Sequence, residues 1–209
     1  MIPTECKMED LSALEGQVMT LTANLVFGPG DKNISRRTAL NRRLFVRLVD
    51  KGLDEYETAR RHILAQLAEK QRTPDEMAEQ GRVIYMLKFV DHMENCICTV
   101  RRILRLLNHL KGNQDGLEFP RIVRRQIDSL ADDVVDMRNV VEHMDDEIQK
   151  DNIEENESVM IQLLDSQDGV KVAGESLKFS RLGTLLRRLH ELSKNMAEWS
   201  AESSEKSSA

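Results

Sequence analysis

Apolar residues that recur every three or four positions run through most of the chain, and this spacing constrains the fold more than any other feature. The stretch from residue 120 to about residue 150 shows it well, with Ile122, Val123, Ile127, Leu130, Val134, Met137, Val141 and Met144. Such spacing places side chains on one face of an α-helix. The sequence therefore predicts long amphipathic helices that bury their apolar faces against one another.

The same pattern, together with the residues that typically start and end helices, predicts four helices in the first three quarters of the chain. We expect them over residues 10–26, 34–71, 73 to about 111, and 120 to about 150. Gly52 predicts a break in the second helix. The third starts on a strong signal, because Thr73 can cap it, Pro74 suits the first helical position, and Glu76 can close a capping box.

The pattern changes near residue 158, where a small antiparallel sheet is expected. Residues 158–164 are prone to form a strand, and residues 165–169 end in Asp168-Gly169, a sequence that favours a tight reversal. Residues 170–172 fit the returning strand, and residues 176–179 fit a third. Ser180 is then a candidate cap for a last helix that reaches Trp199.

These elements predict a mainly α protein: an up-and-down helical bundle with a small C-terminal β-hairpin and a final helix. We divide the 209 residues into a helical bundle over residues 1–152 and a hairpin plus C-terminal helix, packed on the bundle, over residues 153–202. Residues 203–209 are polar and rich in serine, so we expect a disordered tail. A chain of this length can bury a core without a metal or a disulfide.

The charge balance limits the partners that the chain can bind. The net charge is −6, which argues against broad, non-specific coating of nucleic acid but leaves a local basic groove possible. Arginines cluster at Arg36-Arg37, Arg42-Arg43, Arg60-Arg61, Arg101-Arg102-Arg105 and Arg121-Arg124-Arg125. The simpler interpretation is that these arginines pair with Asp and Glu on helix surfaces. The alternative is one basic patch for RNA, formed by the last two clusters, although Phe119 is the only aromatic ring nearby for base stacking.

Several further features point to an ordinary intracellular protein. Cys6, Cys96 and Cys98 have no framework spacing, so we expect reduced thiols. The first residues carry no apolar run behind a basic start, and the chain has no stretch of membrane-spanning length, so we expect no membrane partner and a cytoplasmic location. No spacing predicts a cofactor or a metal site. The acidic run over residues 142–157 is interpreted as a solvated helix end.

The segment that most resembles a site for chemistry lies near residue 140. Arg138 and His143 point about 140° apart around a helix axis, but an arginine is long enough to swing toward the same cleft. Asn139 and His143 are four residues apart and would share a face. Imidazole can move a proton near neutral pH, guanidinium can hold a phosphate, and an amide can orient either group. This set suits cleavage of a phosphodiester without a metal.

Arg138-Asn139-x-x-x-His143 resembles the Arg-x4-His signature of the HEPN superfamily, whose arginine is often followed by asparagine. The resemblance covers six positions, within a helical context over about residues 34–150. It implies an α-helical bundle that dimerises, so that two copies of the motif share one cleft. It also implies metal-independent cleavage of RNA, with Arg138 and His143 as the catalytic pair and Asn139 in support. The C-terminal hairpin and last helix are not part of the usual HEPN pattern.

Two hypotheses therefore follow from the sequence. The first is a homodimeric endoribonuclease that acts through Arg138 and His143. The second is a non-catalytic helical module that binds another protein or a nucleotide. In that case both residues are surface ion-pair partners of nearby carboxylates, which are Glu142, Asp145, Asp146 and Glu147. Geometry distinguishes the two, because catalytic residues should line a concave surface, whereas surface residues should each pair with a local carboxylate. His62, His92, His109 and His190 show no spacing typical of metal ligands or catalytic triads.

Overall fold

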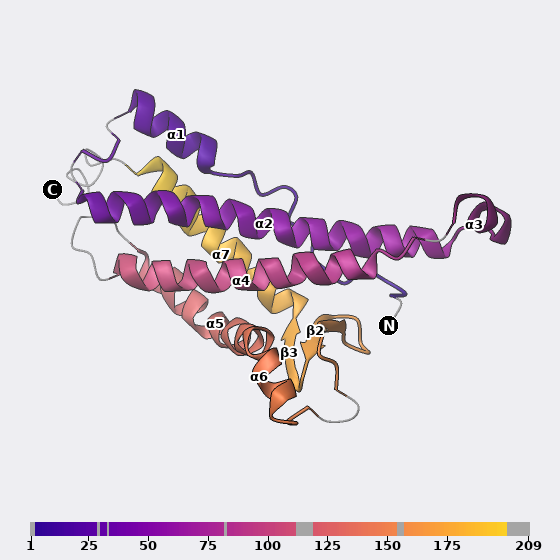
Figure 1. Ribbon diagram of the computed structural model, residues 1–209. Helices are drawn as coiled ribbons and strands as arrows, with labels where there is room; N and C mark the ends of the chain where they lie inside the picture. The colour runs from indigo at the N-terminus through magenta and orange to yellow at the C-terminus, as the bar shows by residue number, and fades with distance from the viewer. Residues whose placement is uncertain are drawn as a thin grey trace.

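The computed structural model describes residues 3–28, 30–32, 34–81, 83–111, 119–153 and 157–199. Within these ranges the chain is mainly helical, with a small three-stranded antiparallel sheet followed by a final helix (Figure 1). The predicted fold class is thereby confirmed. The predicted tail over residues 203–209 lies outside the described residues.

Seven helices and three strands make up the described part of the chain. In chain order they are α1 Val18–Phe27, α2 Arg36–Lys70, α3 Pro74–Gln80, α4 Met86–Lys111, α5 Arg121–Glu142, α6 Met144–Gln149, β1 Gln162–Leu163, β2 Gly169–Val172, β3 Glu175–Lys178 and α7 Phe179–Glu198.

The antiparallel pair of α2 and α4 forms the spine of the molecule (Figure 1). Fully buried residues such as Phe45 and Val49 on α2, and Ile97 and Val100 on α4, belong to one continuous core. The predicted break at Gly52 is wrong, because α2 runs unbroken through it. Gly52 is buried where α4 and α7 approach, and its carbonyl accepts a hydrogen bond from the Cys96 thiol at 3.5 Å. The glycine therefore allows close packing of the three helices.

The N-terminal signal at residue 73 is confirmed, but the single helix expected from there to residue 111 is wrong. The Thr73 side chain accepts the Glu76 N–H, and the Glu76 carboxylate accepts the Thr73 N–H, which completes the capping box. α3 then stops at Gly81, whose φ of 74° lies in the left-handed region that favours glycine. The chain resumes as α4 five residues later, so α3 is a separate helix beyond the end of α2 (Figure 1).

The sheet follows the order β1-β2-β3, with both pairs antiparallel. The predicted reversal over residues 165–169 and the two strands that follow it are present. Val170, Val172 and Leu177 are buried and join the same core as the helices. The sheet packs against α5 and leads directly into α7. Three short strands have too little core of their own to be stable alone, so this packing stabilises them.

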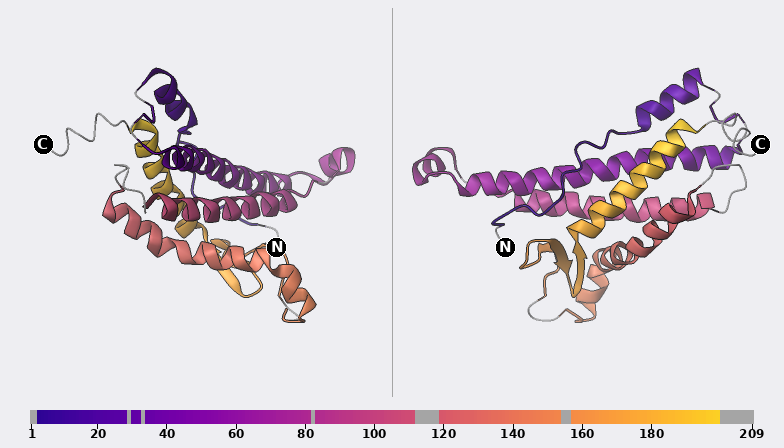
Figure 2. Two further views of the ribbon diagram at one scale, coloured as in Figure 1. Left: turned by 60° about the vertical axis from the view of Figure 1, so that its left-hand side comes forward. Right: turned by 180° about the vertical axis from the view of Figure 1, so that it is seen from behind.

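α7 crosses the spine diagonally on the face opposite to the one shown in Figure 1 (Figure 2). Its buried stripe includes Leu182, Leu185, Leu189 and Leu192, as the periodicity predicted. Ser180 does not cap the helix, however, because α7 begins at Phe179 directly after β3 and has no side-chain cap. The strand and the helix therefore meet without a loop.

The first helix also differs from the prediction, which placed its start at residue 10. Residues 3–17 form a non-helical segment with a turn at residues 11–14, and α1 begins only at Val18. The carboxylate of Asp50 on α2 accepts the main-chain N–H groups of Gln17 and Val18, both at 2.9 Å. The helix thus receives its N-terminal cap from a residue more than 30 positions away, which a local pattern cannot show.

Candidate functional site

The predicted catalytic segment lies where α5 ends. The expected helix to residue 150 is wrong, because α5 stops at Glu142 and a new helix, α6, starts at Met144. His143 occupies the junction with φ −105° and ψ 14°, and its N–H donates to the Asn139 carbonyl at 3.1 Å. The break places a histidine at the C-terminal end of α5 and three carboxylates in the first turn of α6, an arrangement that suits both helix dipoles.

Arg138 is directed toward α4 and does not meet His143. Its guanidinium forms an ion pair with Glu142, one helical turn further along α5, and its side chain is 23% exposed. It also lies near Cys98 of α4: burial raises the pKa of the Cys98 thiol, and the charge of Arg138 acts to lower that pKa. The guanidinium is therefore paired within α5, and its charge acts on a thiol of α4.

His143 points into solvent, with a side chain that is 59% exposed. Its Nδ1 atom lies 3.6 Å from the Asp146 carboxylate, which is equally open. Asn139 is exposed, and among the described residues no hydrogen bond joins its amide to the His143 ring. The structure thus does not bring the three predicted site residues together. Arg138 and His143 each pair with a local carboxylate.

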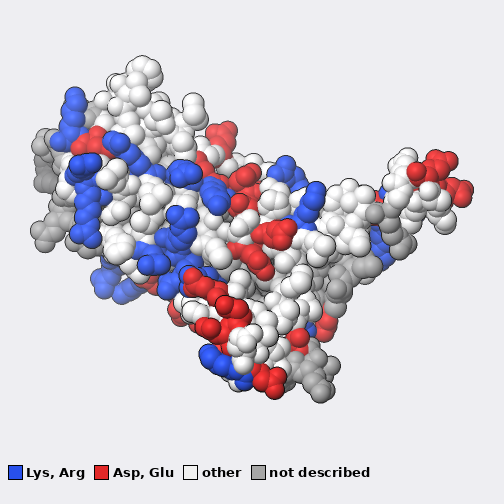
Figure 3. Space-filling view, viewed as in Figure 1, with Lys and Arg blue, Asp and Glu red and all other residues white. Residues whose placement is uncertain are grey.

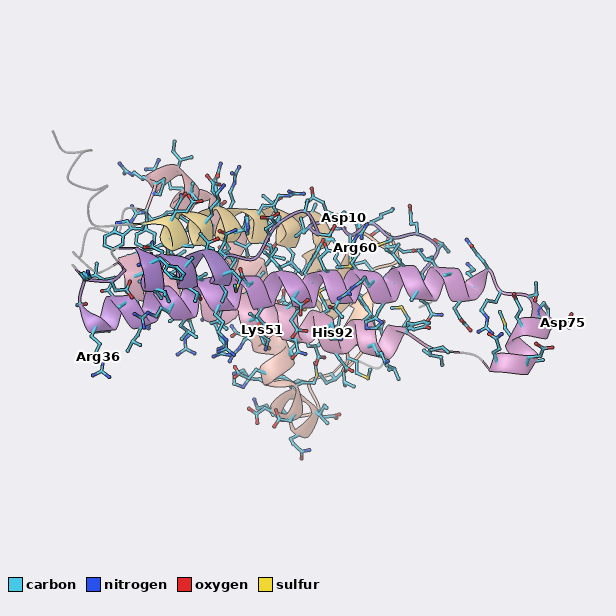
Figure 4. All side chains as sticks on the ribbon, turned by 90° about the horizontal axis from the view of Figure 1, so that it is seen from above. Asp10, Arg36, Lys51, Arg60, Asp75 and His92 are labelled. Atoms are coloured by element: carbon cyan, nitrogen blue, oxygen red, sulfur yellow. The ribbon has the colours of Figure 1, made fainter. Side chains whose placement is uncertain are left out.

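A different group of residues forms a basic surface over α2 and α4. We define the arginine face as Arg36 and Arg47 of α2 with Arg101, Arg102 and Arg105 of α4. In the space-filling view, basic side chains gather over the N-terminal half of α2 and the C-terminal half of α4 (Figure 3). Figure 4 shows Arg36 and Lys51 on one side of α2, while Arg60 and Asp10 lie on the other side.

The arginine face is distinguished by what its side chains do not contact. Within the described ranges, none of its five guanidinium groups has an ion-pair or hydrogen-bond partner. The prediction that the basic clusters pair with carboxylates is therefore wrong for this group. It is right for Arg42 and Arg43, which share Asp31, and for Arg60, which binds Asp10.

A shallow groove of about 190 Å³ lies within the arginine face, between α2 and α4. Leu44, Leu48 and Leu106 supply its apolar part, while Arg102, Arg105 and His109 supply its polar part. A second groove, of about 250 Å³, lies between α4 and α5, where Arg101 and Lys111 lie beside Asp128 and Asp132. Acidic groups thus accompany the basic ones where α4 meets α5, whereas no acidic residue lines the groove between α2 and α4.

Sequence reasoning missed Arg47 and the pairing of its helix with α4. The only basic patch that the sequence suggested, as the alternative interpretation, joined Arg101, Arg102 and Arg105 to the cluster after residue 120, because the two clusters flank the same loop. The usable signal was the antiparallel pairing of two adjacent long helices, which places the first half of α2 beside the second half of α4.

No family model matches the sequence, and neither a curated protein nor a solved structure shows detectable similarity to it. The HEPN resemblance therefore depends on the six positions from Arg138 to His143 alone. In the described part of the chain, no helix has both the length and the apolar character needed to cross a membrane. Nor do the described His, Cys, Asp and Glu side chains form a group of three that could hold a metal ion.

Proposed function

We propose that this protein is a non-catalytic helical module that binds RNA through the arginine face. The observation that carries this proposal is a set of five arginines that have no ion-pair or hydrogen-bond partner among the described residues, in a chain whose net charge is −6. Carboxylates outnumber basic groups in the chain, so pairing would be easy to achieve. Guanidinium groups left open to solvent on adjacent helices are the usual footprint for phosphate binding.

The chemistry of the face favours contacts to the backbone of the RNA. The arginine face and its groove contain no Phe, Tyr or Trp, and stacking on such rings is the main way in which proteins hold unpaired bases. We therefore expect binding to double-stranded RNA with little dependence on sequence. Most of the affinity should come from the release of counterions, so binding should weaken steeply as salt increases.

The ribonuclease prediction has less support from the geometry. A phosphate at Arg138 would have to displace Glu142, and His143 would have to leave Asp146 and approach Arg138. In a homodimer, contacts between the two copies of the motif could displace Glu142 and move His143 toward Arg138. Both dimerisation and cleavage stay predictions. Sedimentation velocity at micromolar concentration measures the first, and the RNA assay below measures the second.

The test uses a 20-base-pair RNA duplex, fluorescence anisotropy and a matched pair of double variants. Arg102→Ala with Arg105→Ala removes two charges from the arginine face, whereas Arg187→Ala with Arg188→Ala removes two charges from α7, where both arginines are paired. We expect the first variant to bind about tenfold more weakly, with a salt dependence shallower by about one per lost phosphate contact. The second should bind like the wild type.

The same RNA, run on a denaturing gel after incubation with a chelator, should remain intact. Cleavage that is lost in both His143→Ala and Arg138→Ala would instead establish the ribonuclease hypothesis. Equal weakening by the two double variants would contradict the proposal, because it would show that total charge, and not the arginine face, determines binding.

A further inference from the structure

The far end of the α2–α4 pair carries an apolar groove that has no part in the arginine face. We define the tip as the end of α2 from Gln66, together with α3 and residues 83–87. It projects beyond the body of the molecule (Figures 1 and 2), and Asp75 marks its end in Figure 4, opposite to Arg36. Its groove, of about 270 Å³, is lined by Gln66, Glu69, Lys70, Met77, Val83, Ile84 and Met86.

Several apolar side chains of the tip are exposed to solvent. Ile84 is 66% exposed and Leu87 58% exposed, and Val83 is also open to solvent. A cluster of this kind at the end of a projecting element is costly in water unless a partner covers it. The apolar residues of the tip therefore point to a binding role.

Polar side chains hold this apolar segment in place. The Gln66 side chain accepts the Tyr85 N–H at 2.8 Å, and the Glu69 carboxylate accepts the Val83 N–H at 3.2 Å. Both side chains are almost fully buried. Arg72 bonds the carbonyls of Glu76 and Gly81, and so ties α3 to the same frame. The groove is thus an ordered feature with a defined shape.

Charge indicates what the groove would bind. α3 carries Asp75, Glu76 and Glu79 and no basic residue, and acidic side chains surround the end of the tip (Figure 3). Lys70 is the basic residue that lines the groove. We infer that the tip is a docking site for an amphipathic helix of another protein, whose apolar side chains enter the groove and whose Lys or Arg residues face the carboxylates of α3.

A random 16-residue peptide library displayed on phage is the probe for this inference. It is selected on the full-length protein and counter-selected on Ile84→Ser, and the enriched peptides are then synthesised for anisotropy. Val26→Ser is the matched control, because Val26 is 64% exposed but lies on α1, away from the tip. We expect peptides with apolar residues three or four apart and a net positive charge, and binding about tenfold weaker to Ile84→Ser than to Val26→Ser.

Reversal of charge tests the second half of the inference. Asp75→Lys with Glu79→Lys should also weaken these peptides, while the affinity for the RNA duplex should be the same in Ile84→Ser and wild type. The inference would be overturned by enriched peptides that are acidic, by equal binding to the two serine variants, or by a failure to enrich any peptide. Self-association that Ile84→Ser abolishes would show that the occupant is a second copy of this chain, which would also overturn it.

Discussion

The guanidinium of Arg42, which is fully buried, donates its Nε–H to the main-chain carbonyl of Met196 at 2.6 Å. The same group bonds the carbonyl of Trp199 at 3.0 Å and forms an ion pair with Asp31, and its Cζ atom lies 5.3 Å from the centre of the Trp199 ring. Arg42 of α2, together with the Asn24 amide of α1, thus satisfies main-chain carbonyls at the end of α7.

Arg42→Ala should therefore destabilise the protein by about 3 kcal/mol, because it removes the side-chain donor of the Met196 carbonyl and the buried one of the two guanidinium partners of Asp31. Chemical denaturation monitored by circular dichroism measures this change. Arg43→Ala is the matched control, since Arg43 binds the same Asp31 from the exposed side and should cost less than about 1 kcal/mol. Equal effects of the two variants would show that burial of Arg42 does not matter.

The cap that Asp50 provides to α1 leads to a second prediction. Asp50→Ala should cost about 1–2 kcal/mol, because two N–H groups at the start of α1 lose their acceptor. Hydrogen exchange should then accelerate at Val18 and in the first turn of α1. Asp54→Ala, one turn further along α2 on an exposed residue, should change stability by less than about 0.5 kcal/mol. Unchanged exchange in α1 would contradict the assignment of the cap.

The stacked imidazoles of His62 and His92 predict a loss of stability in mild acid. Their ring centroids are 5.3 Å apart, and burial, followed by the charges of His92, Lys88 and Arg61, lowers the pKa of His62 below its ordinary value of 6.5. The unfolded chain then takes up this proton first as the pH falls. The stability contribution is complete above pH 6.5 and is lost as the pH falls through the lower pKa of the folded state.

His62→Gln should accordingly reduce the difference in unfolding free energy between pH 7.5 and pH 5. His92→Gln should do so in part, because it removes one of the charges that lower the pKa of His62. Urea denaturation at several pH values measures both effects. A pH dependence that is the same in His62→Gln and wild type would show that other groups cause it.

Cys98 provides a chemical reporter for the proposed RNA surface. It is exposed on α4, where partial burial raises the pKa of its thiol and the charges of Arg138 and Lys51 act to lower that pKa, whereas Cys96 is fully buried. Alkylation by iodoacetamide should modify Cys98 and leave Cys96 intact, as mass spectrometry of peptides can show. A bound RNA duplex should slow the reaction at Cys98 several-fold and leave the rate at Cys6 unchanged. Equal protection of Cys98 and Cys6, or protection of neither thiol, would show that the RNA binds elsewhere.

Local signals predicted the parts of this fold that depend on neighbouring residues. The capping box of Thr73 and Glu76 closes within four positions, and the reversal before Gly169 depends on a short turn sequence. The periodicity of α7 likewise predicted its buried stripe. Each of these features has its cause within one or two turns of chain, so a single sequence contains what is needed.

The wrong predictions concern features that depend on residues far away in the sequence. The start of α1 depends on Asp50 of α2. Helix α2 continues through Gly52 because α4 and α7 pack closely there. The burial of Arg42 depends on its contacts with residues 196–199. Arg138 and His143 were likewise expected on one long helix, but α5 ends at Glu142 and His143 lies at the junction with α6. The open arginines of α2 and α4 become one surface only through long-range pairing.

The partners of Arg42 are synthesised at different times, and this affects folding during translation. On a ribosome, α2 and α4 leave the exit tunnel well before α7 and can pair as soon as both have emerged. The guanidinium stays hydrated during that interval, because the carbonyls of residues 196–199 that will bind it have not yet been synthesised. The end of the nascent α2–α4 hairpin that carries Arg42 therefore remains hydrated until α7 packs against it.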